Sequence, residues 1–321
     1  MMLQSGYLTM QSKMQIAILG STGHIAKNLI FEMNKRSEFH LHLFARKIDA
    51  LNNFINLYTN DPGNITVRGL EEFSNYSYDV IINCIGIGNP SILKRDPSMV
   101  FRLTEQFDNL VLDYLQHNKN TLYLYFSSGA VYGSDFSMPV DRNSYNKLNV
   151  NHSSSNDFYS ISKIYTEAKH RSYAEYNVVD LRVFGFFSQF ADLTAPYFLN
   201  ELITCVQKDQ VFITNHSNMI RDYIHPTDLI ALIDKLIFKH DLNDVFDVYS
   251  LAPISKFEII ELFEHKYNLI YQIENLPGSS PTGEKNSYYS VNNKLADIGY
   301  YPTLSSLNTI MMATDHILNN D

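Results

Sequence analysis

The chain has 321 residues, of which 45% are apolar and 18% charged, so it can bury a large core and is not a disordered polymer. Its formal net charge of −9 and the lack of a basic stripe exclude nucleic acid as an expected partner. Two cysteines, Cys84 and Cys205, are too few for a disulfide framework or a four-cysteine zinc site, and they fit a reducing cytoplasm.

The amino-terminal residues 1–13 are polar and lack the apolar stretch of a signal peptide, so we expect a loose extension, with Met10 and Met14 as alternative start residues. No apolar run reaches the roughly 18 residues that a membrane-spanning helix needs, and no membrane partner is expected. His40 and His42 are the one close histidine pair, and we interpret them as ordinary strand residues, with no metal predicted.

From there, short apolar runs alternate with segments of helical periodicity. The predicted strands cover residues 14–19, 41–45, 65–67, 80–87, 122–126 and 178–184. Helices are predicted after residue 23, over 101–115 and over 159–176, and the Asn- and Ser-rich segment 143–156 predicts an exposed loop. This alternation indicates an α/β fold with a doubly wound, Rossmann-like parallel sheet and right-handed crossovers.

Beyond about residue 186 the pattern becomes irregular, and helices are predicted over 195–208, 226–239 and 255–266. No internal repeat or sharp linker is evident. We therefore assign residues 14–185 to a dinucleotide-binding Rossmann domain. Residues 186–321 are expected to form mainly a smaller substrate-binding lobe, with some segments returning to the first domain.

A glycine-rich turn, GSTGHIA at residues 20–26, follows the first predicted strand and opens the first helix. Gly20 and Gly23 let the backbone approach a pyrophosphate, while the helix offers its amides and the positive end of its dipole. Ala26 permits close packing of helix on strand. An ordinary tight turn has the same spacing, but the position between strand and helix predicts a dinucleotide site.

The end of the second predicted strand bears on the choice of dinucleotide. Many such folds carry an acid there that binds the adenosine ribose, whereas this sequence reads FARK at residues 44–47. Arg46 could instead pair bidentately with a 2′-phosphate, the alternative being a solvated surface arginine. We therefore expect NADP(H), with NAD as the alternative cofactor.

Three further residues suggest the chemistry. Tyr159 and Lys163 are four apart on a predicted helix, so their side chains share one face. A lysine ammonium beside a phenol favours the phenolate and lowers a pKa that is ordinarily about 10. Such a tyrosine can exchange a proton with an alcohol oxygen during hydride transfer, and Ser128 would hold that oxygen.

The same spacing recurs at Tyr165 and Lys169, which form the competing pair. Tyr159 is preferred because it follows the polar loop, where the helix would open toward the cleft. The remaining alternative for Tyr159 and Lys163 is an exposed helix pair without a catalytic role.

With these motifs in order, the sequence resembles the extended short-chain dehydrogenase/reductase family of sugar-nucleotide epimerases, dehydratases and reductases. The similarity runs from Met14 over nearly the whole chain. It is carried by GSTGHIA at 20–26, FSSGAVYG at 126–133, YSISK at 159–163, RDYIHPTD at 221–228 and IGYYPTL at 298–304. The resemblance implies a nucleotide-sugar substrate, a place in polysaccharide biosynthesis, and a homodimer built on helices 101–115 and 159–176.

By this resemblance Ser128 is the catalytic hydroxyl residue, four before the tyrosine of VYG, and also contacts the substrate. Arg221 would grip the nucleotide diphosphate, unless it forms a structural salt bridge with Asp222 or Asp228. His225 is expected to pack or cap locally. The predicted cofactor contacts are Gly20, Thr22, Gly23, His24, Ile25, Arg46, Cys84, Ile85, Gly86 and Lys163.

Several positions depart from the family pattern. Gly129 and Ala130 stand where 4,6-dehydratases carry an Asp-Glu pair, so dehydration is not expected. Gly185 replaces an asparagine that contacts the diphosphate, and residues 187–188 lack the Gly-Pro that often follows. Gly69 replaces an aspartate near the adenine. The nucleotide-sugar pocket is therefore expected to be modified.

These observations predict an NADP(H)-dependent enzyme that reduces a ketone on a nucleotide-linked deoxysugar, with the proton from Tyr159. A nucleotide-sugar 4-epimerase with tightly bound NAD is the first alternative. A noncatalytic dinucleotide sensor that binds partner proteins is the second, and the intact Ser128, Tyr159 and Lys163 argue against it, since a sensor needs no proton donor.

Overall fold

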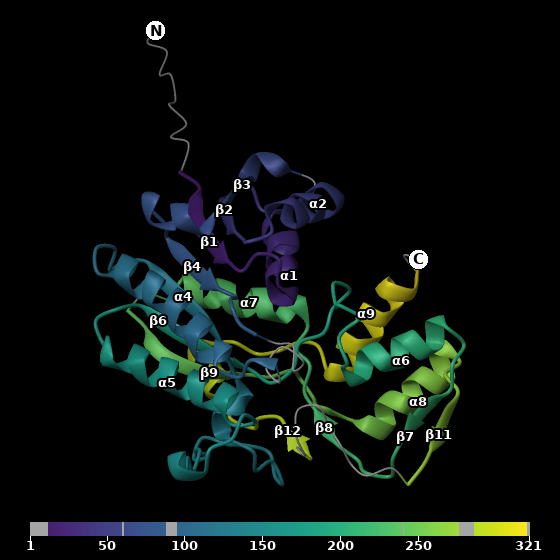
Figure 1. Cartoon of the computed structure of the whole chain (residues 1–321). Helices are drawn as coiled ribbons and strands as arrows, with labels where there is room; N and C mark the ends of the chain where they lie inside the picture. Colours follow the sequence, from purple (N-terminus) through teal and green to yellow (C-terminus); the bar gives the residue numbers. More distant parts are fainter. Residues whose placement is uncertain (1–11, 60, 88–94, 240, 276–285, 320–321) are drawn as a thin grey trace.

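The computed structural model describes residues 12–59, 61–87, 95–239, 241–275 and 286–319. A seven-stranded parallel sheet forms its centre, with the strand order β3-β2-β1-β4-β5-β6-β9 (Figure 1). Its strands are β1 (Met14–Leu19), β2 (Phe39–Phe44), β3 (Ile65–Arg68), β4 (Val80–Asn83), β5 (Leu122–Ser128), β6 (Val178–Val183) and β9 (Asn243–Val248). The order reverses between β1 and β4, which defines the switch point where ligands bind in such sheets. The predicted fold class is confirmed.

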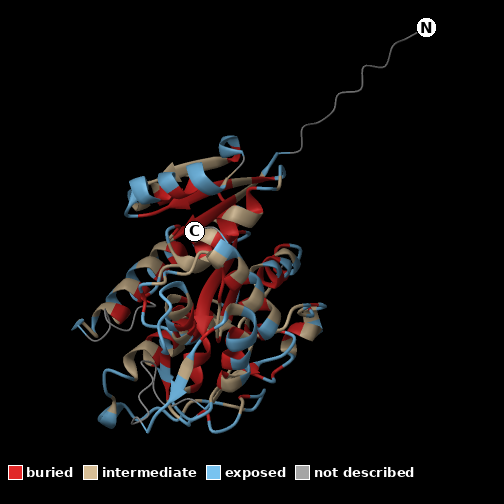
Figure 2. Cartoon of the chain, turned by 90° about the vertical axis from the view of Figure 1, so that its right-hand side faces the viewer, coloured by how far each residue is buried: buried red, intermediate tan, exposed pale blue. Residues whose placement is uncertain are grey.

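Alternate strand residues point to opposite faces of the sheet, and each face has its own apolar core. Ile16 and Ile18 pack on the side covered by α1 (His24–Met33), α2 (Ile48–Tyr58) and α7 (Pro226–Ile237). Ala17 and Leu19 pack on the other side with α4 (Met99–Leu115), and α5 (Phe158–Ser172) lies beside α4. Figure 2 shows the buried residues concentrated along the central strands.

The remaining elements form a smaller lobe beside the sheet, drawn to its right in Figure 1. Its helices are α6 (Phe198–Gln207), α8 (Lys256–Tyr267) and α9 (Ser306–Asn319), which share a third apolar core. Two small sheets, with the orders β10-β8-β12 and β11-β7, complete it. Their strands are β7 (Phe212–Thr214), β8 (Ile220–Arg221), β10 (Ile254–Ser255), β11 (Tyr271–Ile273) and β12 (Ser287–Tyr288).

Two predicted segments end earlier than expected, and one helix is additional. The strand predicted over 80–87 ends at Asn83, because the Asn83 side-chain oxygen accepts a hydrogen bond from the amide of Ile85 and turns the chain. The helix predicted to reach residue 176 ends at Ser172, since Tyr173 leaves the helical conformation. The helix α2, whose Leu51, Phe54 and Ile55 are buried, was not predicted.

Within the described ranges, the structure has no helix that is both long enough and apolar enough to cross a membrane.

Candidate active site

The glycine turn directly follows β1 and lies at the carboxyl ends of the neighbouring strands β1 and β4. Gly20 has a φ of +74°, and a side chain there would meet the backbone of Cys84 and Ile85 at 3.1 Å, so only glycine fits. Gly23 is the N-cap of α1, and no side chain caps this helix end. The turn therefore fits a dinucleotide, because its backbone can lie against a pyrophosphate at the start of α1.

The predicted cofactor residues around this turn come together. Cys84 donates its amide to Leu19 across the strands, at 3.0 Å, and burial raises the pKa of its thiol. Ile85 contacts the position of Gly20, while nothing lies within 4 Å of a side chain built at Gly86. Thr22 and Ile25 lie at the turn and in the first turn of α1, respectively.

His24 links the start of α1 to the segment after β6. Its Nε2 lies 2.8 Å from the Ser188 hydroxyl, and its ring packs edge-on against Phe186. Burial, assisted by the charge of Lys27, lowers the pKa of His24 to about 4, so the imidazole is neutral at physiological pH. Its side chain thus joins α1 to the segment after β6, while its backbone forms the first residue of α1.

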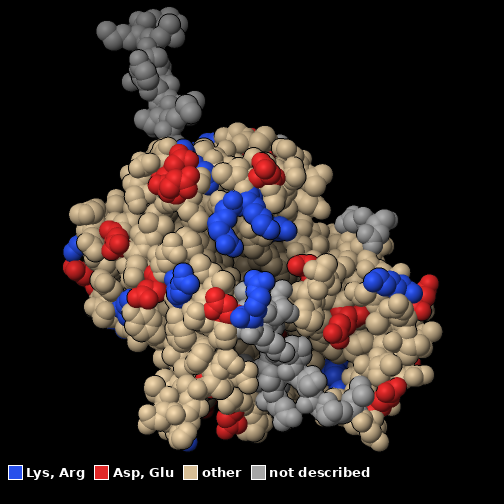
Figure 3. All heavy atoms as spheres, viewed as in Figure 1, with Lys and Arg blue, Asp and Glu red and all other residues tan. Residues whose placement is uncertain are grey.

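Arg46 lies just beyond β2 and is exposed, as is Lys47. Figure 3 draws the molecule from the same side as Figure 1, and it shows Lys and Arg side chains grouped beside a hollow near the centre of that view. The strand ends without an acid, as the sequence indicates, and the nearest acidic residue in the chain is Asp49 in the first turn of α2.

Ser128, Tyr159 and Lys163 converge at the end of β5. Ser128 closes β5, and Tyr159 lies in the first turn of α5, one turn before Lys163. Burial raises the pKa of Tyr159, and a hydrogen bond with Ser128 acts in the opposite direction. The lowered pKa expected from Lys163 is therefore not found, because burial of the phenol outweighs the other effects. The Lys163 nitrogen lies 5.9 Å from the centre of the Tyr159 ring.

Two residues of β5 accept hydrogen bonds from the Lys163 side chain. Its ammonium donates to the Tyr125 hydroxyl and to the Phe126 carbonyl, both at 2.8 Å. Burial lowers the pKa of Lys163 to about 8, despite the opposing carboxylates of Glu167, Asp180 and Asp108. The lysine therefore carries its charge at neutral pH and loses it in mildly alkaline solution.

The competing pair is placed differently. Tyr165 is 49% exposed on the outer side of α5, and the Lys169 ammonium pairs with Asp108 of α4 at 2.5 Å. Neither residue faces Ser128. The structure thus brings the preferred pair close to Ser128 and places the other pair elsewhere on α5.

Arg221 lies on β8, beside the catalytic centre. Its guanidinium group is 5.9 Å from the ring of Tyr288, its register partner on β12, and burial lowers its pKa. The two carboxylates considered as alternative partners are engaged elsewhere. Asp222 accepts hydrogen bonds from Ser250, and Asp228 accepts them from the amides of residues 303–304.

Two departures from the family pattern have a steric reason. A side chain at Gly185 would lie 2.4 Å from the Asp222 carbonyl, so the chain after β6 packs directly on the segment that follows β8. A side chain at Gly129 would lie 2.4 Å from the Phe184 ring. His225 caps α7 by accepting a hydrogen bond from the Thr227 amide, as predicted.

Tyr288 is a site residue that the sequence analysis missed. Its hydroxyl lies 3.3 Å from the Ser128 Oγ, although the two residues are 160 positions apart. The amide of Ser287 donates to the Phe136 carbonyl at 2.8 Å, and Ser290 donates to the buried Asp247 at 2.6 Å. The first bond fixes β12 against the segment after β5, and the second ties the chain after β12 to β9. No local sequence pattern predicts such contacts.

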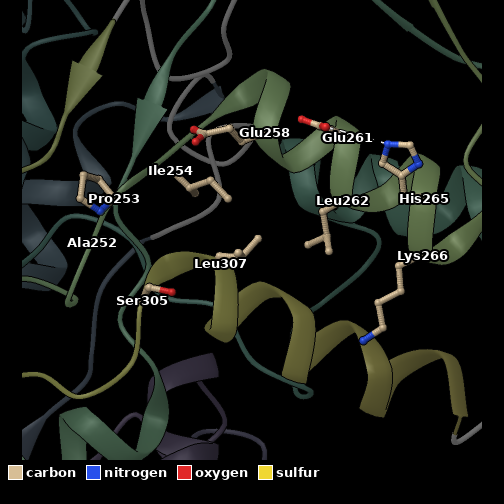
Figure 4. Close-up of a pocket in the computed structure, with 10 residues that line it drawn as sticks. All are labelled: Ala252, Pro253, Ile254, Glu258, Glu261, Leu262, His265, Lys266, Ser305 and Leu307. Atoms are coloured by element: carbon tan, nitrogen blue, oxygen red, sulfur yellow. Dashed lines mark ion pairs between the residues drawn. The ribbon is translucent and has the colours of Figure 1, made fainter.

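A groove of about 700 Å³ between α8 and the start of α9 contains none of the predicted site residues. Figure 4 shows Leu262 and Leu307 facing it from the two helices. Glu258 serves the capping box of α8, and Glu261 lies 3.9 Å from His265 one turn away. Lys266 pairs with Asp315 of α9, and the Ser305 hydroxyl bonds Asn308, so these polar groups of the groove hold α8 and α9.

The sheet order, the glycine turn and the cluster of Ser128, Tyr159 and Lys163 define a Rossmann-type dinucleotide enzyme. The sequence profile of the NAD dependent epimerase/dehydratase family matches residues 16–252, and the chain belongs to this family. It is therefore an enzyme of the short-chain dehydrogenase/reductase type. Among curated proteins, no sequence matches the chain.

Solved structures of sugar-nucleotide enzymes share the fold. A UDP-N-acetylglucosamine 4-epimerase from Methanobrevibacter ruminantium M1 has a TM-score of 0.78 and 15% identity, covering 97% of this chain and all of its own. A UDP-glucuronic acid 4-epimerase from Bacillus cereus, solved with NAD and UDP-glucuronic acid, has a TM-score of 0.77 and 18% identity over 96% and 100%. A dTDP-glucose 4,6-dehydratase from Bacillus anthracis, solved with NAD, has a TM-score of 0.75 and 16% identity over 96% and 97%.

Proposed function

We propose that the protein is an NADP(H)-dependent reductase of a ketone on a nucleotide-linked deoxysugar. The observation that carries this proposal is the convergence of Ser128, Tyr159 and Lys163 at the same edge of the parallel sheet as the glycine turn. When bound, the reduced nicotinamide supplies the hydride that adds to the carbonyl carbon. The remaining requirement is a proton for the oxygen, which the protein's own residues meet.

In the proposed mechanism, Ser128 donates a hydrogen bond to the ketone oxygen and so stabilises the negative charge that develops there. Tyr159 gives its phenolic proton to that oxygen, forming the alcohol and leaving a phenolate. The Lys163 ammonium stabilises the phenolate, which regains its proton from solvent before the next turnover. Gly129 and Ala130 have no proton to give, and dehydration is therefore not part of the proposal.

For the cofactor, we propose that Arg46 pairs with the 2′-phosphate of NADP(H). The support is the exposed guanidinium directly after β2, on a strand that ends without an acid. The solved Bacillus enzymes named above contain NAD, so NAD is the alternative cofactor. We also propose that residues 186–321 mainly bind the substrate, with Arg221 on its diphosphate.

A nucleotide-sugar 4-epimerase is the second candidate. The observation in its favour is the similarity in fold to solved 4-epimerases, which likewise covers nearly the whole chain. An epimerase would reuse one dinucleotide that stays bound, whereas a reductase consumes NADPH.

The two candidates are separated by one experiment in two stages. Mass spectrometry first identifies any nucleotide that co-purifies with the protein. A panel of nucleotide-linked ketosugars is then incubated with NADPH, and its absorbance at 340 nm is followed. Steady oxidation of NADPH that requires a ketosugar supports the reductase. Interconversion of sugar epimers without NADPH consumption would replace it with the epimerase.

A further inference from the structure

Tyr288 brings a third hydroxyl group to the catalytic centre from near the end of the chain. Its ring lies between two phenylalanines, with ring centres 4.7 Å from Phe136 and 5.2 Å from Phe184. The pairing of β12 with β8 fixes its backbone opposite Arg221. With ring and backbone both fixed, the hydroxyl is directed at Ser128, whose Oγ lies 3.3 Å away.

The hydrogen bonds of Ser128 can be counted. A serine hydroxyl has one proton to donate and two lone pairs that accept. The amide of Ala130 donates to the Ser128 Oγ at 3.2 Å and uses one lone pair. A proton from Tyr288 would use the other. The Ser128 proton would then serve the hydrogen bond with Tyr159, and it would pass to a ketone oxygen that enters between these two residues. A ketone oxygen only accepts hydrogen bonds, so this is the arrangement that reduction requires.

Tyr288 remains protonated in the working range. Burial raises the pKa of its phenol far above neutral, and this outweighs the opposing effect of its hydrogen bonds with Ser128 and the Ala130 amide. Tyr288 therefore keeps a proton to donate at neutral pH. The proton donor to substrate is a different residue, Tyr159, which shares a helix face with Lys163.

We propose that Tyr288 is a positioning residue whose hydroxyl donates to the Ser128 Oγ and thereby directs the Ser128 proton at the ketone oxygen. This inference rests on the proposed function. The separation of 3.3 Å is long for two hydroxyl groups. We expect it to shorten when substrate is bound, as catalytic hydrogen bonds commonly do.

The test is a double-mutant cycle on the full-length protein, assayed with NADPH and the ketosugar that the panel identifies. Tyr288→Phe keeps the ring and removes only the hydroxyl. We expect kcat to fall about 10-fold, while KM for the sugar nucleotide stays within about twofold. In a Ser128→Ala background the same change should lower kcat by less than about twofold, because Tyr288 acts through Ser128.

Tyr289→Phe is the matched control, since it removes the hydroxyl of the adjacent tyrosine, and its kcat should be unchanged. The Tm and the Kd for NADPH of every variant show that folding and cofactor binding survive. Unchanged kcat in Tyr288→Phe, a loss expressed mainly in KM, or an equal loss in both backgrounds would overturn the inference alone. Absence of turnover by the unaltered protein on every ketosugar would overturn the proposed function, and this inference with it.

Discussion

The ammonium group of Lys163 lies 2.8 Å from the hydroxyl of Tyr125, and both side chains are buried. The same ammonium lies 4.3 Å from the centre of the Tyr125 ring. With the Phe126 carbonyl as its other partner, two of the three ammonium protons are used by β5. Tyr125 therefore helps to keep charge on a lysine that burial tends to neutralise.

The first prediction concerns the pH dependence of turnover. Lys163 has a pKa of about 8, so its charge, and with it support for the Tyr159 phenolate, is lost as the pH rises through 8. Tyr125→Phe removes an acceptor of the ammonium proton, which lowers this pKa further. We expect the alkaline limb of the kcat profile to move down by about one pH unit.

Tyr123→Phe is the control for this prediction. Tyr123 lies two residues before Tyr125 on the same face of β5, but its hydroxyl bonds Asp108 instead of Lys163. The alkaline limb of the kcat profile of Tyr123→Phe should coincide with that of the unaltered protein when kcat is measured from pH 6 to 10. Superimposable profiles for all three proteins would remove Tyr125 from this role.

The second prediction concerns Tyr159. Tyr159→Phe removes the proton donor but keeps the ring, so kcat should fall by about 10² or more while the Kd for NADPH is preserved. Steady-state kinetics and fluorescence titration of NADPH measure the two quantities. Tyr165→Phe, on the exposed side of the same helix, should behave like the unaltered protein. Near-normal turnover in Tyr159→Phe would contradict the assignment.

The third prediction concerns Arg46. If its guanidinium holds a 2′-phosphate, Arg46→Ala should raise the Kd for NADPH by about 10- to 100-fold and leave the Kd for NADH almost unchanged. The Kd of Arg46→Lys for NADPH should lie between those of the unaltered protein and Arg46→Ala, because lysine keeps the charge but loses the bidentate geometry. Isothermal titration with both dinucleotides measures this. Equal losses for NADPH and NADH would assign Arg46 to another task.

The fourth prediction concerns stability. His170 is fully buried, and its two ring nitrogens lie 2.7 Å from Asp108 and from Asp180. Burial lowers the pKa of His170, but the two carboxylates outweigh it and raise the pKa to about 9. The unfolded value is about 6.5. The imidazolium therefore stabilises the fold fully below pH 6.5, and this contribution is lost as the pH rises through 9.

His170→Asn removes the imidazolium that lies between the two buried carboxylates, which keep only Lys169 and Arg171 as cationic partners, so the free energy of unfolding should fall by about 3 kcal/mol at pH 6. The difference from the unaltered protein should narrow at pH 9.5, where His170 is itself neutral. Urea denaturation at pH 6, 8 and 9.5 measures this difference. His265→Asn, at an exposed position, should show little change at any of them. A constant difference across this range would contradict the raised pKa.

The fifth prediction concerns assembly. The helices α4 and α5 lie side by side, with the rings of Phe101 and Phe158 5.6 Å apart, and Tyr165 is exposed beside them. We predict an isologous homodimer with a four-helix interface. Light scattering at tens of micromolar should report twice the chain mass of 37.0 kDa, and Tyr165→Lys should lower it. A 37.0 kDa particle for the unaltered protein would contradict the prediction.

Local patterns predicted the parts of the molecule that local physics controls. Buried parallel strands are continuous apolar runs, and the glycine turn needs the positive φ of Gly20, so both are visible in sequence. The end of β4 was wrong because it depends on one side chain, that of Asn83, bonding two residues ahead. Tyr288 was invisible because its meeting with Ser128 depends on the pairing of β12 with β8.

The return of β9 to the large sheet has a consequence for how the chain is made. β9 pairs along the whole of β6, so a nascent chain that ends at residue 185 carries an unpaired edge of buried strand residues, among them Val178, Val179 and Leu181. Open apolar edges of this kind recruit other chains and aggregate. We therefore do not expect the first 185 residues to fold into a stable domain while the rest of the chain is still being synthesised. The seven-stranded sheet is complete only after β9, which ends at Val248, has been synthesised.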